Sequence, residues 1–183
     1  SEMCIRDRDG TAVKTPGEKI FPYIQKNLDD IITVEDDELV VAFLDMVENH
    51  KMVIENSGLL TVAALKHLNV KEKRVVSILS GGNMDVITMS SVVQQGLIFR
   101  DRIFTVSVLL PDKPGELSRV ADTIAKEQGN VIKLEHNQFV SINRSAAVEL
   151  RITLEAFGTD HKNQIMKALE KNGYKPKLVR TNL

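Results

Sequence analysis

Residues 74–85 read Arg74-Val75-Val76-Ser77-Ile78-Leu79-Ser80-Gly81-Gly82-Asn83-Met84-Asp85. The run of β-branched and aliphatic residues has the composition of a strand buried on both faces in a parallel sheet. It ends in Ser-Gly-Gly-Asn, and ligands of open α/β sheets bind at the carboxyl ends of the strands. Glycines let a backbone approach a ligand closely, and a serine hydroxyl both donates and accepts hydrogen bonds. The segment therefore predicts a ligand-binding turn or an ordinary strand-to-loop turn, and spacing alone leaves both open.

The order of these residues resembles a known cofactor strand. V-V-S-I-L-S-G-G-N-M-D is similar to the C-terminal cofactor strand of fold-type II pyridoxal-phosphate (PLP) lyases, specifically the threonine ammonia-lyase (threonine dehydratase) family and its serine racemase relatives. The resemblance implies that PLP is the cofactor, that Ser80 donates a hydrogen bond to its pyridine nitrogen, and that Gly81, Gly82 and Asn83 lie beside it. A hydroxyl cannot protonate that nitrogen, so the electron sink is weaker and prompt loss of the substrate's β-hydroxyl is favoured.

Two earlier segments extend the resemblance. Residues 9–17 are similar to the A-D-G-x-A-V-x-x-P-G segment of the family, which implies that Gly10 lies beside the cofactor ring. Glu55-Asn56-Ser57-Gly58 stands where the family has E-G-A-G or E-P-x-G, so Glu55 matches as a residue near the ring while Asn56 and Ser57 depart. The family's S-x-K-x-R-G motif, with the lysine that bonds the cofactor, does not occur in the chain. The chain therefore holds no catalytic residue of the family, and we expect it to be inactive alone.

Composition narrows the classes of function. The formal net charge of −1 favours neither nucleic acid nor an anionic membrane as a partner. No apolar run approaches the roughly 18 residues that span a bilayer. A single cysteine excludes an internal disulfide framework and fits a reducing cytoplasm. The acids of residues 35–38 predict the start of a helix and not a metal site, and no histidine pair has zinc spacing.

Two features of the sequence indicate where the first domain begins and ends. Residues 1–8 resemble a translated sequencing adapter, so we expect the native sequence to start near Asp9, inside a longer gene, and the chain to be a fragment. Residues 87–95 predict a helix with Gly96 as its C-terminal stop, followed by a short connector. We therefore expect residues 9–99 to be the C-terminal part of a lyase catalytic domain.

Residues 103–183 predict a second domain in the order strand, helix, strand, strand, helix, strand. Its strands are expected at residues 103–110, 131–142, 146–156 and 174–180, its helices at 116–128 and 160–172, and a hairpin at Asn143-Arg144-Ser145. A βαββαβ order implies a ferredoxin-like sandwich, with two helices on one face of an antiparallel sheet. The fold class of the whole chain is accordingly α/β.

The first turn of this domain carries a motif. L-P-D-K-P-G-E-L is similar to the D-x-P-G-x-L signature of the ACT domain, a regulatory module that binds amino acids. The resemblance implies an amino-acid effector held near Asp112, Pro114, Gly115 and Leu117, and Asn130 matches a further turn of the motif. Backbone amides near Gly115 suit a carboxylate, and the Asp112 side chain is expected to organise the turn by accepting backbone hydrogen bonds. The same fold with no ligand remains an alternative, and His136-Asn137-Gln138, where relatives often read H-D-R, leaves the effector's identity open.

The motifs together predict the C-terminal portion of a cytoplasmic threonine ammonia-lyase. By resemblance, the intact enzyme is a homo-oligomer that converts L-threonine to 2-oxobutanoate and ammonia with PLP, under amino-acid regulation through the ACT domain. Two alternatives stay open. One is a non-enzymatic amino-acid sensor in which only the residues after Arg102 matter, and the other is a serine dehydratase or racemase with the same cofactor strand.

Overall fold

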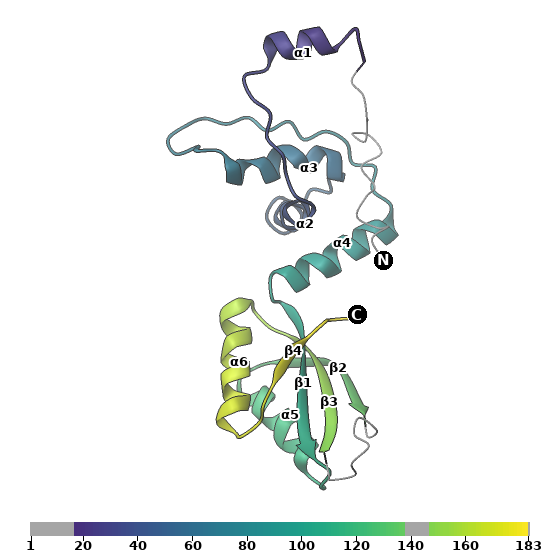
Figure 1. The fold of residues 1–183 in the computed structure, drawn as a ribbon, viewed down its shortest axis with the longest axis vertical. Coiled ribbons are helices and arrows are strands. Elements are labelled where there is room, and N and C mark those ends of the chain that lie inside the picture. Colours follow the sequence, from purple (N-terminus) through teal and green to yellow (C-terminus); the bar gives the residue numbers. More distant parts are fainter. Residues whose placement is uncertain (1–16, 138–146, 183) are drawn as a thin grey trace. The chain divides into compact units, whose positions relative to one another are not determined.

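The computed structural model describes residues 17–137 and 147–182 and divides the chain into two compact units between Gly96 and Leu97 (Figure 1). The adapter-like residues 1–8, Gly10 and the expected hairpin turn lie outside the described residues. No helix of the described ranges is long and apolar enough to cross a membrane.

The first unit is built from helices and extended segments. It contains α1 (Phe21–Asn27), α2 (Asp36–Asp45), the π-helical turn η1 (Met46–His50), α3 (Asn56–Ala63), the 3-10 turn η2 (Ala64–His67) and most of α4 (Val86–Phe99). Its core is a cluster of buried side chains from α2, α3 and α4, which includes Phe43, Leu59 and Val92. Leu39, Val40 and Phe43 form an apolar stripe along α2 at the centre of this unit.

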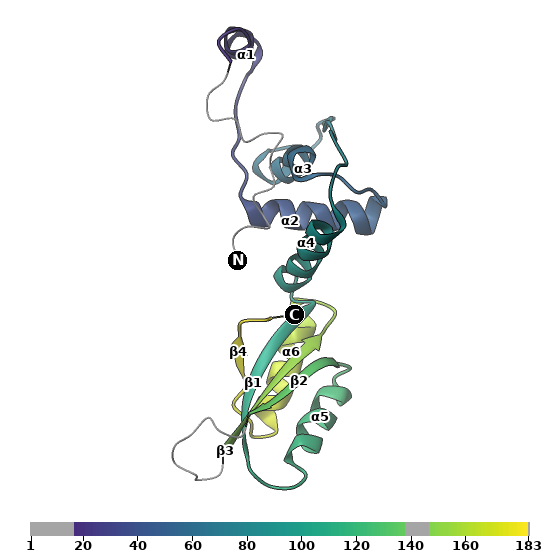
Figure 2. The ribbon, with the colours of Figure 1, turned by 90° about the vertical axis from the view of Figure 1, so that its right-hand side faces the viewer.

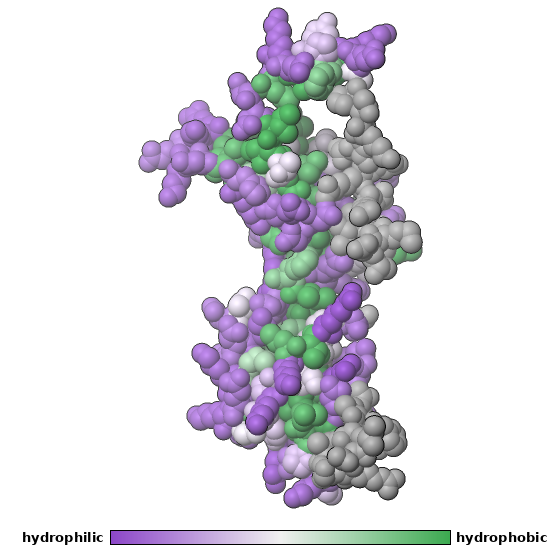
Figure 3. Space-filling view, in the orientation of Figure 1, coloured by the Kyte–Doolittle hydropathy of each residue, from purple (hydrophilic) through white to green (hydrophobic). Residues whose placement is uncertain are grey.

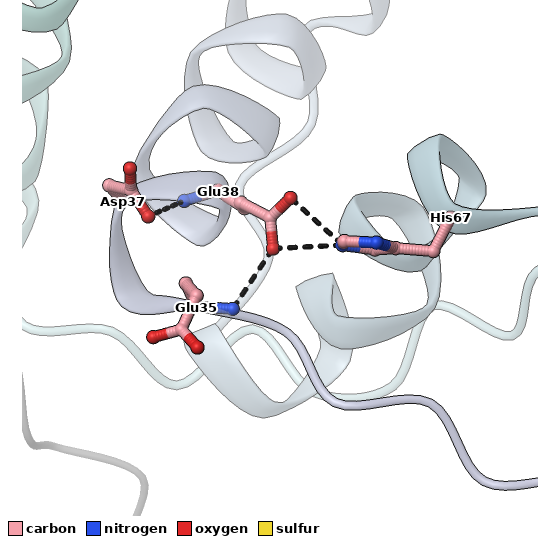
Figure 4. Close-up of polar contacts among 4 residues, drawn as sticks. All are labelled: Glu35, Asp37, Glu38 and His67. Atoms are coloured by element: carbon pink, nitrogen blue, oxygen red, sulfur yellow. Dashed lines mark hydrogen bonds and ion pairs between the residues drawn. The ribbon is translucent and has the colours of Figure 1, made fainter.

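The acids before α2 cap that helix, as predicted. Glu35 is the N-cap residue and Glu38 completes a capping box, because its Oε2 accepts a hydrogen bond from the Glu35 amide at 3.0 Å. The Glu38 carboxylate also lies 2.9 Å from Nε2 of His67 at the end of η2 (Figure 4). The hydrogen bond from the Glu35 amide, followed by the one from His67, holds the pKa of Glu38 below its usual range. This pair links the start of α2 to η2.

The predicted strand at residues 74–79 is wrong for this chain. Residues 73–85, which we call the extended segment, lie between η2 and α4 without helix or strand, and Val76 is 90% exposed. A strand buried on both faces needs strands beside it and helices above and below. The described residues before Ile103 form no strand, so this segment has no sheet to join. Apolar residues are visible on the surface of the first unit (green in Figure 3).

Gly96 does not stop the preceding helix, in contrast to the prediction. α4 continues to Phe99, and Gly96 is buried inside it. A Cβ at this position would lie 2.5 Å from Cδ1 of Leu44 and 3.3 Å from Cγ1 of Val40, both in α2. The glycine therefore permits close packing between α4 and α2, a requirement that cannot be distinguished from a helix stop in the sequence.

The second unit has the predicted βαββαβ order. Its elements are β1 (Ile103–Pro111), α5 (Glu116–Lys126), β2 (Asn130–Asn137), β3 (Ala147–Glu155), α6 (Thr159–Lys171) and β4 (Lys177–Val179). The strands form one sheet in the order β2-β3-β1-β4, and every neighbouring pair is antiparallel (Figure 2). Alternate residues of β1, from Phe104 to Leu110, join Val120 and Ile124 of α5 and Ile165 and Leu169 of α6 in one core. Both helices therefore cover the same face of the sheet.

The opposite face of this sheet is polar. Thr105 and Thr153 lie in register on β1 and β3, and their hydroxyl oxygens are 2.9 Å apart. Ser107 donates a hydrogen bond of 2.6 Å to Glu149, which also pairs with Arg151 at 3.2 Å. The alternation of apolar and polar residues along β1 thus places polar side chains on the face opposite the helices, where Thr105, Ser107 and Thr153 are themselves buried.

Candidate functional site

The predicted cofactor turn lies against the residues that precede α3. The amide of Glu55 donates a backbone hydrogen bond of 3.4 Å to the carbonyl of Gly81. The Glu55 carboxylate sits over the Cα of Gly81, because a Cβ there would lie 2.2 Å from Cδ of Glu55. Gly81 has φ +76°, a conformation that residues with a side chain rarely adopt. The structure therefore brings together two residues that the sequence analysis selected from separate motifs.

Gly58 lets the first turn of α3 touch the same turn. A Cβ on Gly58 would lie 2.0 Å from the carbonyl oxygen of Ser80, which leaves no space for any side chain. One helical turn further on, Thr61 donates a hydrogen bond of 3.0 Å to the carbonyl of Ile78. These contacts hold the extended segment on α3 although it belongs to no sheet. This role of Gly58 and Thr61 does not follow from the sequence motifs, although Gly58 is the glycine of the E-x-x-G motif.

Ser57 bonds directly to Glu55. Its hydroxyl donates a hydrogen bond to Oε1 of the carboxylate, and both side chains are half-buried. The neighbouring Asn56 is buried, with 6% of its surface exposed. The two residues that depart from the family motif therefore lie inside the site and not at its edge.

The far end of the turn is exposed and leads into α4. Ser80, Gly82 and Asn83 are exposed, so the hydroxyl of Ser80 is accessible to a ligand. Asp85 then accepts hydrogen bonds from the amides of Ile87 and Thr88, at 2.8 and 3.0 Å, and from the hydroxyl of Thr88. The bonds from the Thr88 hydroxyl and amide hold the pKa of Asp85 below its usual range. Asp85 therefore caps α4 and fixes where the turn ends.

A second site is a cavity of about 190 Å³ at the turn between β1 and α5. Four of the predicted effector residues line it, namely Asp112, Pro114, Gly115 and Leu117. Gly115 is the N-cap of α5 with φ +92°, and no atom lies within 4 Å of the position of its missing Cβ. The backbone at the helix start is thus open to the surroundings, as an anion site requires.

The structure adds one residue to this cavity. His136 of β2 lines it together with the buried Leu110, Val148 and Leu150. In the sequence, His136 is distinguished only as part of a departure from the family pattern. Its pairing with Leu150 across β2 and β3 is a long-range register, which a single sequence does not reveal.

Asn130 lies away from the other predicted effector residues within one chain. It pairs with Glu155, opposite Ile103, and its Nδ2 donates a hydrogen bond of 3.2 Å to Glu155. The turn follows Pro111, which pairs with Ala147 at the opposite end of β1. A strand rises about 3.3 Å per residue, so the length of β1 separates Asn130 from the turn.

The expected role of Asp112 in closing the turn is also wrong. In the described part of the chain its carboxylate makes no hydrogen bond. Backbone bonds close the turn instead, from Lys113 to the carbonyl of Pro111 at 2.8 Å and from Glu116 to the carbonyl of Lys113 at 3.4 Å. Pro114 and Gly115 fix the backbone directly, so no side-chain acceptor is needed.

Comparison with known sequences connects the first unit to a family. Residues 7–81 match the family described as "Pyridoxal-phosphate dependent enzyme", and the matched range includes Glu55, Ser80 and Gly81. This segment is similar to that family. The matched range ends at Gly81, the glycine on which the Glu55 carboxylate rests.

Curated relatives match most of the chain. It is 35% identical over 168 residues to the L-threonine ammonia-lyase of Geobacter sulfurreducens, which covers 91% of this chain and 42% of that protein. It is 31% identical over 172 residues to the L-threonine ammonia-lyase of Thermotoga maritima, with 93% and 43% covered. A mitochondrial threonine dehydratase of Schizosaccharomyces pombe is 30% identical over 79% of this chain and 26% of its own length. The chain thus spans less than half the length of these relatives.

Solved structures match the chain over a smaller part. The ACT domain of prephenate dehydrogenase from Bacillus anthracis is similar over 40% of this chain and 99% of its own length, at 20% identity and a TM-score of 0.32. Prephenate dehydratase from Streptococcus mutans is similar over 42% of this chain and 40% of its own length, at 21% identity and a TM-score of 0.35. The βαββαβ assignment of the second unit rests on its own strand order.

Proposed function

We propose that this chain is the C-terminal portion of a PLP-dependent threonine ammonia-lyase, with residues 9–99 from the catalytic domain and residues 103–183 as an ACT regulatory domain. The observation that carries the proposal is the contact of Glu55 with Gly81 at the S-G-G-N turn, inside the segment that matches the PLP family. Two relatives above 30% identity named L-threonine ammonia-lyase support threonine as the substrate. The product would be 2-oxobutanoate, with release of ammonia.

The residues of the turn fit the ring end of PLP. When bound, PLP supplies an electron sink for the reacting amino acid. Ser80 would donate its hydroxyl proton in a hydrogen bond to the ring nitrogen without transferring it, because a hydroxyl is far too weak an acid. The missing side chain of Gly81 leaves room for the Glu55 carboxylate, which lies against the turn. The exposed position of Ser80 in the isolated chain is compatible with this role.

A chimera tests the proposed activity. Residues 9–183 would replace the matching segment of the Geobacter sulfurreducens L-threonine ammonia-lyase, and 2-oxobutanoate formation would be measured. We expect activity in the chimera and none in the chain alone, which contains no S-x-K-x-R-G lysine. A folded, PLP-loaded chimera without threonine deamination would contradict the proposal. Higher activity on serine than on threonine would favour the serine dehydratase alternative.

Ser80 can be tested in the same chimera. Ser80→Asp places a carboxylate at the ring nitrogen, which stabilises the protonated ring. We expect threonine turnover to fall at least about tenfold, which corresponds to about 1.4 kcal/mol in the barrier. Ser80→Asn is the matched control, since it has the size of aspartate without its charge. Equal turnover in the two variants would remove the charge argument.

We further infer that residues 103–183 bind an amino-acid effector at the cavity beside Gly115. The support is the open backbone at the start of α5, the lining residues of the sequence motif and His136 as an added polar group. The edge strand β2 exposes Val131, Ile132 and Leu134. Pairing of two copies would cover such an edge, which supports a homo-oligomer in which a partner's strand completes the effector site.

Calorimetric titration of the chain with the common amino acids, together with sedimentation, tests this site. We expect one amino acid to bind with a dissociation constant of roughly micromolar to millimolar, about −4 to −8 kcal/mol. Gly115→Val should abolish binding, because its side chain would fill the space that the ligand carboxylate needs. Gly173→Val is the matched control, since Gly173 also has positive φ (+85°) and open surroundings but does not line the cavity. Equal loss of binding in both variants would indicate backbone strain and contradict the site.

A non-enzymatic sensor remains the second candidate because the second unit has a core of its own. Binding of an amino acid together with an inactive, folded chimera would favour it. Residues 9–183 contain no cysteine and therefore form no disulfide bond, and a cytoplasmic location stays part of the proposal.

A further inference from the structure

We propose that Ser57 is a positioning residue that holds the Glu55 carboxylate over Gly81, an inference whose functional meaning rests on the proposed PLP site. Its hydroxyl donates to Oε1 of Glu55, and the carboxylate occupies the space where a side chain of residue 81 would be. The family pattern has alanine or an unspecified residue at this position, so the bond is a feature of this chain's E-N-S-G variant.

Several hydrogen bonds restrain Glu55. Its amide is tied to the carbonyl of Gly81, and its carbonyl accepts the amides of Gly58 at 3.0 Å and Leu59 at 3.2 Å in the first turn of α3. These bonds fix the backbone and the Cβ direction of Glu55, but they leave its χ angles free. The hydroxyl of Ser57 is the described donor that reaches the carboxylate itself. It therefore restrains the part of Glu55 that faces the turn.

The consequence for the site is a carboxylate held in a fixed position beside Gly81. A glutamate side chain has about 1.5–2 kcal/mol of rotamer entropy to lose when it is ordered. A carboxylate held in advance requires no such ordering when a ligand binds, which is the general advantage of a preorganised site. Gly81 contributes by absence of a side chain, because a Cβ would expel the carboxylate from this position. Ser57 therefore restrains the carboxylate of Glu55, and Gly81 leaves room for it.

Carbon-13 NMR of the chain labelled at glutamate carboxyl carbons tests the inference, with Glu55→Gln to assign the signal. At a fixed pH near 8, Ser57→Ala should shift the Glu55 Cδ signal and the Gly81 amide signal, and Ser57→Thr should restore both. Ser57→Gly, which also lacks the hydroxyl, should reproduce the alanine result and covers a failure of that variant to fold. Thr61→Val is the matched control, because it removes a hydrogen bond to the same extended segment without touching Glu55.

The measurement distinguishes failure of the Ser57 inference from failure of the lyase proposal. If Ser57→Ala and Ser57→Gly leave both signals in place, or if Thr61→Val shifts the Glu55 signal equally, Ser57 does not position the carboxylate. The measurement needs neither cofactor nor substrate, so a negative outcome leaves the lyase proposal standing. Conversely, an inactive chimera leaves the Ser57 result standing.

Discussion

Asp101 joins the start of the second unit to α6. Its Oδ1 lies 2.7 Å from Nζ of Lys162, and its Oδ2 accepts a hydrogen bond of 2.8 Å from Thr159. Burial by itself raises the pKa of Asp101, but the bonds from Lys162 and Thr159 outweigh it and the net pKa is lower than usual. Asp101 also adopts φ +54°, so the side chain stabilises a backbone conformation that few residues accept.

We expect Asp101→Ala to lower the free energy of unfolding of the second unit by about 1 kcal/mol, because a partly buried pair and a hydrogen bond are lost. The folded pKa is depressed, so the stabilisation is complete above the ordinary value of 3.8 and disappears as pH falls through the lower folded pKa. Urea denaturation at pH 7 and near pH 2.5 measures both effects. Asp122→Ala, at an exposed position of α5, is the control, and an equal effect there would contradict the assignment.

At Gly58, the sign of the change in stability on substitution by alanine tests the packing of α3. In an ordinary helix, glycine to alanine stabilises by about 0.5–1 kcal/mol. Here the new Cβ would lie 2.0 Å from the backbone oxygen of Ser80, so we expect Gly58→Ala to destabilise the first unit and release the extended segment from α3. Hydrogen exchange of the Glu55 amide reports the release. Gly17→Ala, with no atom within 4 Å of its Cβ, should change nothing, and a stabilised Gly58→Ala would refute the packing.

At the scale of elements, α4 depends on its first turn. Asp85 accepts both exposed amides of that turn, from Ile87 and Thr88. We expect Asp85→Ala to speed hydrogen exchange at these two amides, whereas Asp85→Asn should retain much of the protection because asparagine also caps helices. The depressed pKa of Asp85 means that wild-type protection is full above its usual value and is lost as pH falls through the lower folded pKa. Equal exchange in Asp85→Ala and wild type would exclude the cap.

The elements also show what a sequence can predict. The start of α2 follows from the acids of residues 35–38, and the βαββαβ order of the second unit follows because its sheet is formed within the chain. The segment at residues 74–79 reads as a strand because its composition is correct, but a strand also needs partners that composition does not contain. Gly96 reads as a helix stop for a similar reason, since the space it leaves is filled by Leu44, far away in the sequence.

The site residues show the same difference between local motifs, which the sequence reveals, and long-range contacts, which it does not. Glu55 and Gly81 could be selected from motifs, and the structure places them in contact. The roles of Ser57 and Thr61 depend on which atoms lie opposite them, and Asn130 depends on its register in the sheet. Local chemistry is therefore readable from the sequence, whereas pairings over long distances along the chain are not.

For the whole molecule, the two units differ in how completely they bury their apolar side chains. The second unit buries a continuous core of strand and helix residues. The first buries the centre of its helices but exposes α1 entirely among its described side chains, as well as much of the extended segment. The first unit therefore leaves more of its large apolar side chains exposed than the second does.

The exposed extended segment has a practical consequence for anyone who handles the chain in solution. This segment is rich in β-branched residues and exposes Val75, Val76 and Ile78. No strand of the described ranges pairs with it, and such a segment can act as a template for self-association. We expect light scattering to grow steeply with protein concentration, and Val76→Lys, a charge at a position 90% exposed, to suppress it without changing the helical signal. Leu178→Lys, at an exposed apolar position of the second unit, should leave scattering unchanged. If Val76→Lys and Leu178→Lys reduce light scattering equally, the net charge of the chain controls its solubility, and the extended segment does not.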